Sequence, residues 1–285
     1  MVRLCRVVHG VVPDAVEVWA KLESFNPSGS VKDRAAWGII SEAERAGRIG
    51  ARTLLDSSSG NTGIAYGMIA AARGHRLTLC LPKNANVERK KLLRALGVHI
   101  VETDPLEGSD GAIRAAQALA ADPQYLYLDQ YSNPENWKAH VRGTAAEIWA
   151  DTSGSITHWV AGLGTTGTFV GTSRGLRAFD TSMKCISVQP EGPFHGLEGL
   201  KHLESAIVPG IWDASVADDN VPAPTEASIT MMQRLAREEG LLTGPSGGAA
   251  VWAALEVAKG LSTGVVVTVL PDSGERYLSE EHLWA

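Results

Sequence analysis

The sequence predicts an α/β protein built from mainly parallel sheets with helices on both faces. Short apolar runs alternate with longer helical patterns along the 285 residues, which is the arrangement that parallel sheets require. Clusters of Gly, Ser and Thr recur where the apolar runs end, as they do in strand-to-helix turns that bind anions. With 44% hydrophobic residues, the chain can bury the core of one large domain or two modest ones.

The strands are predicted from short apolar or alternating runs. They are expected at 17–22, 53–55, 77–81, 98–101, 125–128, 157–161, 185–189 and 265–270. Helical patterns fill the intervals, and a glycine such as Gly47 or Gly97 ends some of them. The helices are expected at 31–46, 64–72, 87–96, 112–121, 134–150, 168–178, 225–239 and 247–259. The stretch 191–224 is the least regular, and long inserts of this kind are often functional.

The composition argues against several classes of protein. The 26 basic and 32 acidic residues give a formal net charge of −6, which argues against nucleic-acid binding through bulk charge. No apolar run approaches the roughly 18 residues of a membrane span, and the N-terminus lacks the pattern of a signal peptide. The three cysteines are widely spaced and have no clustered histidines, so we expect neither a disulfide framework nor a metal site. A cytoplasmic enzyme or binding protein is therefore the expectation.

The first motif, NPSGSVKDR at 26–34, contains a lysine at a predicted helix start. Ser30 and Asp33 fit a capping box. Lys32 falls in the first turn, where the helix dipole disfavours a cation and would lower the pKa of the lysine. A neutral amine can act as nucleophile or base, whereas an ordinary surface lysine is the alternative interpretation.

Two glycine-rich turns each follow a predicted strand and open a predicted helix. The first, DSSSGNTG at 56–63, gathers N–H groups and hydroxyls that suit a carboxylate or phosphate, although a plain N-cap is the alternative. The second, GLGTTGT at 162–168, matches the GxGxxG pattern of dinucleotide-binding turns, with Glu191 as a weak candidate for the ribose contact. Its three threonines suit a compact monophosphate better than a pyrophosphate.

Two further motifs lie near the C-terminus. TGPSGGAA at 243–250 opens a helix, and Ser246 is most simply interpreted as its N-cap. PDSGERY at 271–277 follows the most apolar strand. It is either a structural ion-pair turn or part of a site at the carboxyl end of that strand.

Together, in this order, the motifs resemble the cysteine synthase (O-acetylserine sulfhydrylase) family of pyridoxal-phosphate (PLP) enzymes. The segment 26–34 and the double threonine at 165–166 are most similar to the B-type isozyme, and the resemblance runs from about residue 16 to 279. It implies the fold type II of PLP enzymes, tryptophan synthase β-like, with two doubly wound α/β domains. The smaller, mobile domain is expected at 36–137. The larger, cofactor-binding domain is expected at 1–35 and 138–285, with PLP in the cleft between the two.

The resemblance also implies roles for individual residues. Lys32 is expected to form the Schiff base with PLP and to act as the catalytic base. The remaining cofactor contacts are expected from Asn61 at the ring hydroxyl, Ser246 at the pyridine nitrogen, and Gly164, Thr165, Thr166, Gly167 and Thr168 at the phosphate. The α-carboxylate of the substrate is expected to bind Ser58, Ser59, Gly60, Asn61, Thr62 and Gln130.

The implied activity is that of a transferase that forms L-cysteine from O-acetyl-L-serine and sulfide by β-replacement, through an aminoacrylate intermediate. A cytoplasmic homodimer is implied, with a serine acetyltransferase as a candidate partner. The enzymatic alternatives are O-phosphoserine as the donor, or cystathionine or 2,3-diaminopropionate formation. The non-enzymatic alternative is a PLP-binding or partner-binding protein that kept the fold, and NAD binding ranks behind all of these.

The sequence departs from the family pattern in places that bear on these expectations. The Gly-Asn-Thr-Pro-Leu segment usual upstream in the family is not found, and a serine leads the carboxylate loop where threonine is common. The insert 191–202 has no arginine, and its cationic candidates are Lys201 and two histidines. A phosphate leaving group favours the bidentate fork of an arginine, so we expect O-acetylserine to be preferred over O-phosphoserine.

Overall fold

The computed structural model describes residues 1–284 and divides into two compact units. The large unit comprises Met1–Val31 and His140–Ala285, and the small unit comprises Lys32–Ala139. Each unit has its own sheet, and each is described here by itself. No helix in the described part of the chain is long and apolar enough to cross a membrane.

The large unit is built on a six-stranded sheet in the order β1-β2-β10-β7-β8-β9. In that order the strands are Val2–Arg3, Val16–Leu22, Gly264–Leu270, His158–Gly162, Lys184–Pro190 and Asp219–Ala223. Only β1 is antiparallel to its neighbour. Because the other five strands are parallel, their carboxyl ends share one edge of the sheet, where α/β proteins bind their ligands.

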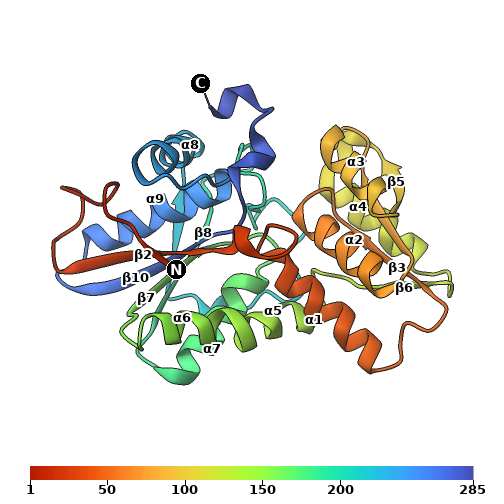
Figure 1. Cartoon of the computed structure of the whole chain (residues 1–285), viewed down its shortest axis with the longest axis horizontal. Coiled ribbons are helices and arrows are strands. Elements are labelled where there is room, and N and C mark those ends of the chain that lie inside the picture. Colours follow the sequence, from red (N-terminus) through yellow and green to blue (C-terminus); the bar gives the residue numbers. More distant parts are fainter. Residues whose placement is uncertain (285) are drawn as a thin grey trace. The chain divides into compact units, whose positions relative to one another are not determined.

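Helices cover both faces of this sheet. Helices α8 (Thr225–Arg234) and α9 (Pro245–Lys259) lie on one face, and α6 (Ala146–Asp151) and α7 (Gly167–Phe179) lie on the other (Figure 1). The alanines and glycines of α9 let it pack closely on the valine-rich strands, and most of its residues are buried. Short helical turns complete the unit: Glu23–Phe25, Val141–Ala145, Ala214–Val216, Leu235–Glu239, Gly274–Tyr277 and Glu281–Leu283.

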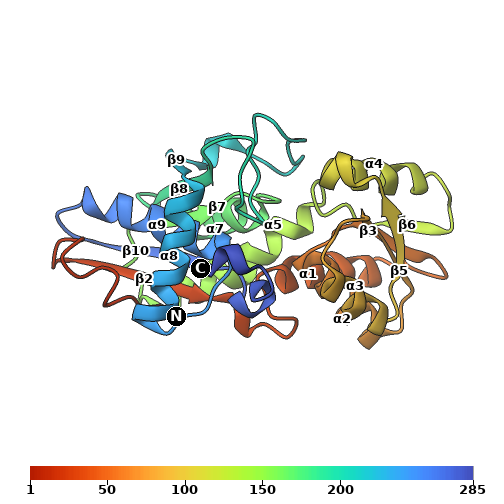
Figure 2. The same cartoon turned by 90° about the horizontal axis from the view of Figure 1, so that it is seen from above.

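The small unit has a four-stranded parallel sheet in the order β5-β4-β3-β6. In that order the strands are His99–Thr103, Leu77–Pro82, Thr53–Ser57 and Tyr125–Tyr127. Helices α1 (Lys32–Arg45), α2 (Asn61–Arg73) and α3 (Val87–Ala95) lie on one face, and α4 (Gly108–Leu119) lies on the other (Figure 2). The turn Pro105–Glu107 precedes α4, and α5 (Pro134–His140) ends where the units divide.

Alternating strand residues supply the two cores of the small unit. Leu54 and Leu79 pack with α1 and α2, whereas their neighbours Leu55 and Cys80 pack with α4. Successive strand side chains point to opposite faces, so a strand covered on both sides is apolar throughout. The predicted α/β class with mainly parallel sheets is therefore confirmed.

The structure corrects three details of the predicted elements. The expected helix at 134–150 is two α-helices joined by the π-helical turn Val141–Ala145, and the expected helix at 225–239 ends in a second π-helical turn, Leu235–Glu239. The stretch 191–224 contains β9, which pairs with β8 at the sheet edge. The sequence of β9, DNVPA, is polar and contains a proline, as an edge strand allows, so it gave no apolar signal.

Candidate active site

The turn 164–168 joins β7 to the N-terminus of α7. Thr166 adopts a left-handed conformation with φ of +69°, and its buried hydroxyl has no hydrogen-bond partner within residues 1–284. A side chain on Gly164 would overlap the carbonyl oxygen of Gly199. Thr168 Oγ1 lies 3.3 Å from Nε2 of the buried His140. A helix N-terminus beside an unsatisfied buried hydroxyl is suited to an anion that accepts hydrogen bonds.

Gly199 links this turn to the start of α9. It has a φ of +91°, and a Cβ at this position would lie 3.8 Å from Ser246 Oγ. The next segment runs along the turn, because the Lys201 N–H donates to the Leu163 carbonyl at 2.8 Å. The large unit therefore brings the predicted phosphate turn and Ser246 to one place.

The interpretation of Ser246 as an N-cap is wrong. Gly244 holds the N-cap position, and Pro245 begins the helix with a φ that suits its first turn. Ser246 lies inside the first turn and is 5% exposed. Helix capping therefore does not explain why a serine stands at position 246.

The segment that leads into α1 is anchored to the large unit. The side chain of Asn26 donates to Glu23 Oε2 at 2.7 Å, and Glu23 is itself buried. The Val31 N–H donates to the Pro271 carbonyl at 2.8 Å, at the carboxyl end of β10. Lys32 is the next residue and the first of α1. Val31, the last residue of this part of the large unit, is thus fixed at the carboxyl edge of the large sheet.

The PDSGERY motif forms a structural turn that supports this anchor. Arg276 donates to the Ser28 carbonyl, and the Tyr277 hydroxyl donates to Asp272 Oδ2 at 2.7 Å. The Thr243 hydroxyl donates to the Asp272 carbonyl at 3.3 Å, which connects the turn to the start of α9. The motif therefore positions two candidate segments, the one that precedes α1 and the start of α9.

In the small unit, a buried carboxylate connects the other glycine-rich turn with Gln130. Asp56 ends the apolar part of β3, where its Oδ1 accepts the Ser57 N–H at 2.7 Å and its Oδ2 accepts the Gln130 N–H at 3.1 Å. The Gln130 amide donates to the Ser57 carbonyl at 2.7 Å, and the Asn136 amide donates to the Gln130 carbonyl at 2.7 Å. Gln130 and the turn 57–62 are therefore adjacent.

Hydrogen bonds to the Ser58 side chain also stabilise the turn 57–62. Ser58 Oγ accepts the Gly60 N–H at 3.3 Å and the Gly63 N–H at 3.0 Å. Asn61 and Thr62 then form the first turn of α2, which has no side-chain N-cap. The Ser58 hydroxyl keeps its hydrogen for donation, so the turn can offer hydroxyl and backbone donors to a carboxylate.

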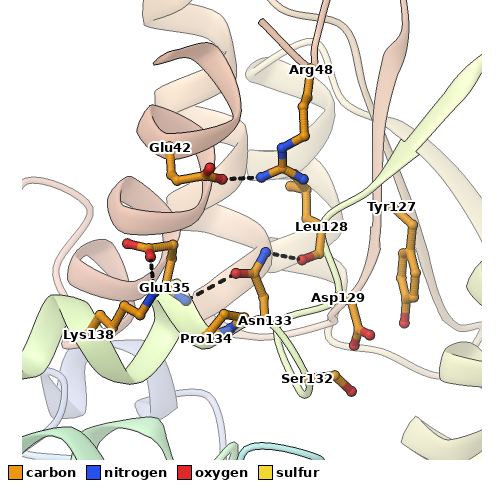
Figure 3. Close-up of a pocket in the computed structure, with 10 residues that line it drawn as sticks. All are labelled: Glu42, Arg48, Tyr127, Leu128, Asp129, Ser132, Asn133, Pro134, Glu135 and Lys138. Atoms are coloured by element: carbon orange, nitrogen blue, oxygen red, sulfur yellow. Dashed lines mark hydrogen bonds and ion pairs between the residues drawn. The ribbon is translucent and has the colours of Figure 1, made fainter. Parts of the chain in front are cut away.

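A polar pocket of about 390 Å³ borders the segment that carries Gln130, and none of the predicted site residues lines it (Figure 3). Its charges are largely paired, with Glu42 bound to Arg48 and Glu135 bound to Lys138. The pocket is therefore separate from the predicted site residues, although it includes Asp129, which has a φ of +51°.

The insert 191–202 contains His195 and His202, two of its three cationic candidates. Burial lowers the pKa of His195, and the nearby His202 lowers it further. His195 Nδ1 accepts the Leu197 N–H at 3.2 Å, as a neutral imidazole does. His195 is therefore uncharged at neutral pH and cannot pair with a phosphate dianion.

The sequence reasoning missed four residues that shape these two regions: Asp56, Asn136, His140 and Gly199. Asp56 had a signal, because it is a carboxylate at the end of a buried strand. Gly199 had none, because Gly164 and Ser246, which it approaches, lie far from it in the sequence. Asn136 contacts Gln130 only six residues away, but that contact depends on how the turn between them folds.

Residues 7–272 match the family described as pyridoxal-phosphate dependent enzyme. The chain is 47% identical to a cysteine synthase of Aquifex aeolicus, over 98% of this chain and 88% of that protein. The chain belongs to the cysteine synthase family of pyridoxal-phosphate dependent enzymes. It is also 41% identical to cysteine synthase B of Salmonella typhimurium, over 93% of this chain and 89% of that protein. The predicted family is thus confirmed.

Solved structures of the cysteine synthase family agree with this fold. A cysteine synthase from Entamoeba histolytica superimposes with a TM-score of 0.94 at 32% identity, covering 99% of this chain and 87% of that one. An O-acetylserine dependent cystathionine β-synthase from Helicobacter pylori gives a TM-score of 0.91 at 32% identity, covering 98% and 93%. The cofactor of the family is PLP, and the unsatisfied Thr166 hydroxyl at the start of α7 fits its phosphate.

Proposed function

We propose that this chain forms L-cysteine from O-acetyl-L-serine and sulfide with PLP as its cofactor. The observation that carries the proposal is the presence of two different anion-binding turns in a chain of this family. One turn has an unsatisfied hydroxyl that suits a phosphate, and the other is hydrogen-bonded to Gln130 and suits a carboxylate. A cofactor phosphate and an amino-acid carboxylate are the two anions that such a reaction must hold.

The cofactor contacts divide between backbone donors and a few side chains. We assign its phosphate to 164–168, its pyridine nitrogen to Ser246, its ring hydroxyl to Asn61 and its covalent attachment to Lys32. When bound, the cofactor withdraws electrons from the α-carbon of the substrate. Lys32 would act as the base that removes the α-proton and as the acid that returns it. A neutral serine at the ring nitrogen leaves that nitrogen unprotonated, which favours β-elimination and replacement.

The substrate is oriented through its α-carboxylate. The N–H groups at the start of α2, together with hydroxyls of Ser58, Ser59 and Thr62, offer convergent donors. The side-chain amide of Gln130 uses one hydrogen for the Ser57 carbonyl and keeps a second for the carboxylate. Fixing the carboxylate in this way sets the α-carbon and the β-leaving group at defined positions.

The donor is O-acetylserine. No arginine lies in 191–202, and the lowered pKa of His195 leaves that side chain neutral. Arg174, which follows the phosphate turn on α7, is paired with Asp213 at 2.8 Å. Comparing kcat/KM for O-acetylserine and O-phosphoserine with sulfide tests this assignment, and a higher value for O-phosphoserine would overturn it.

Cystathionine formation is the second candidate function, because the solved O-acetylserine dependent cystathionine β-synthase has a TM-score of 0.91 with this chain. Both reactions use the same donor and differ in the nucleophile. Incubating the enzyme with O-acetylserine and equal concentrations of sulfide and homocysteine, then quantifying both products, separates the two. A predominance of cysteine supports the proposal, and a predominance of cystathionine replaces it.

The oligomeric state and the cellular location are inferred from membership of the family alone. We infer a cytoplasmic homodimer with small-molecule substrates and with a serine acetyltransferase as a candidate partner. Sedimentation of the purified holoenzyme tests the dimer, and titration with a serine acetyltransferase tests the partner.

A further inference from the structure

We propose that Asp56 is a positioning residue for the substrate-carboxylate site, because its buried carboxylate fastens the turn 57–62 to Gln130. The inference deepens the proposed function and rests on it for the identity of the bound carboxylate. Asp56 itself does not touch the substrate in this account. It acts through the backbone of two segments that are 74 residues apart in the sequence.

The contacts of Asp56 form a closed ring of hydrogen bonds. Its two oxygens accept the N–H groups of Ser57 and Gln130 at 2.7 and 3.1 Å. The ring closes where the Gln130 amide donates to the Ser57 carbonyl at 2.7 Å. Movement of either segment relative to the other therefore breaks at least one of these bonds. Both segments carry the donors that we assign to the substrate carboxylate.

Only a carboxylate satisfies this arrangement. Each of its oxygens accepts one N–H, whereas an asparagine at the same place offers one acceptor and turns an NH₂ group toward the second N–H. Asp56 is fully buried and forms no ion pair within residues 1–284. A buried charge without a cation is costly, so a merely structural link is better made by a neutral side chain.

Five titratable groups in the described chain interact with Asp56. They are Tyr66 on α2, Cys80 on β4, Tyr127 on β6, and Asp129 and Tyr131 in the turn that follows β6. Burial raises the pKa of the Cys80 thiol to about 11 and raises the pKa values of the three tyrosines, so these four groups are neutral at pH 8.

Burial also raises the pKa of the Asp56 carboxyl to about 7, against the lowering effects of its two backbone N–H bonds and of the Tyr66 hydroxyl. The carboxylate form is therefore present at pH 8 and is lost as the pH falls through about 7. Protonation weakens both N–H bonds, because a neutral acid is a poorer acceptor. Donor binding by the wild type should accordingly weaken on acidification.

The test uses the full-length holoenzyme at pH 8 and compares Asp56→Asn with Asp122→Asn. Asp122 is a matched control, since it lies in the same unit and accepts the Gln124 N–H at 2.9 Å, but it is exposed. For Asp56→Asn we expect the KM for O-acetylserine to rise at least about tenfold, with kcat within about threefold and PLP content unchanged. Amide exchange in peptides covering 57–63 and 128–136 should become faster. The control should change none of these.

Two results would overturn the proposal. One is an unchanged KM and unchanged exchange in Asp56→Asn. The other is a parallel loss of kcat, PLP content and thermal stability without a change in KM, which is the signature of a purely structural residue. If Asp56→Asn does not fold, the wild type decides: a KM that rises between pH 8 and pH 6 supports the proposal, and a flat KM refutes it.

Failure of the proposed function is distinguishable from failure of this inference. If the wild type does not use O-acetylserine, the proposed function fails, and the exchange measurement still reports whether Asp56 fastens the two segments. The variant Asp56→Glu adds a further check, because it retains two acceptor oxygens. Its KM should lie between those of the wild type and Asp56→Asn, and a KM above that of Asp56→Asn would count against the proposal.

Discussion

The two glycine-rich turns begin alike and differ in how their hydroxyls are used. Each follows a parallel strand and opens a helix of 13 residues. In the large unit the Thr166 hydroxyl is buried without a partner in the described chain, on a left-handed backbone. In the small unit Ser58 Oγ accepts two N–H groups, and Asp56 fastens the turn to Gln130. Ser57 Oγ in the second turn is also buried without a partner in the described chain, so the turns differ in their bracing by Ser58 and Gln130 and not in having an unpartnered hydroxyl.

The difference matches two kinds of ligand. An unsatisfied buried hydroxyl costs about 1–3 kcal/mol, which is tolerable where a permanently bound phosphate supplies the acceptor. A substrate leaves in every catalytic cycle, so its turn must keep its shape when empty. Under the proposed assignment, the same local sequence pattern binds a cofactor in the large unit and a substrate in the small unit.

The largest expected effect comes from the lysine that both turns would serve. Lys32→Ala should reduce turnover by at least about 10³-fold, because no other group in the account moves the α-proton, whereas some PLP binding through the phosphate turn should persist. Borohydride reduction of the wild type, followed by peptide mapping, should place the pyridoxyl label on Lys32. A label on another lysine would refute the assignment.

Removing the unsatisfied hydroxyl should weaken cofactor retention. Thr166→Val is expected to weaken PLP binding by about 1–3 kcal/mol, which is the value of a charge-assisted hydrogen bond. Thr172→Val is the matched control, because that hydroxyl is also buried and unpartnered in the described structure but lies further along α7. Equal PLP loss in the two variants would mean that the phosphate does not bind at Thr166.

The corresponding change in the other turn should alter substrate binding and leave the cofactor in place. Thr62 is buried in the first turn of α2. Thr62→Val should raise the KM for O-acetylserine about tenfold through loss of one donor, with PLP content unchanged. A drop in PLP content with an unchanged KM would contradict the assignment of the substrate to the turn 57–62 and of the cofactor to the turn 164–168.

The smallest expected effect is a pH dependence of the free energy of unfolding, caused by Asp56 in the small unit. The pKa of Asp56 is about 7 in the folded chain, against 3.8 as its ordinary value. Between these values the folded state holds a proton that the unfolded state releases, so stability falls as the pH rises toward and through 7. From pH 6 to pH 8 the wild type should lose about 1 kcal/mol of unfolding free energy relative to Asp56→Asn. Denaturant unfolding at both pH values measures this, and equal losses in the two proteins would contradict it.

The fold was predictable because its strands are buried on both faces. The run Gly264–Leu270, for example, contains five valine or leucine residues and has its carboxyl-terminal residues buried. The edge strand Asp219–Ala223 was not predictable, since its pairing with β8 and not its own composition makes it a strand. The π-helical turn Val141–Ala145 was also missed, because one extra residue in a turn leaves the apolar pattern almost unchanged.

The two anion turns were predictable because strand, glycine-rich turn and helix start are consecutive in the sequence. The contacts that separate their roles are long-range. Asp56 meets Gln130 across 74 residues, and Gly199 meets Ser246 through the fold of an irregular insert. The local interpretation of Ser246 failed for the same reason, since a serine after a proline fits an N-cap until the position of Gly244 is known.

The absorbance spectrum of the purified wild type tests the central claim most directly. The account predicts a visible band of lysine-bound PLP that is replaced by a different band when O-acetylserine is added. Addition of sulfide should then restore the first band, with release of one L-cysteine per bound cofactor. A protein without a visible band after PLP is supplied, or a band that O-acetylserine leaves unchanged, would contradict the account.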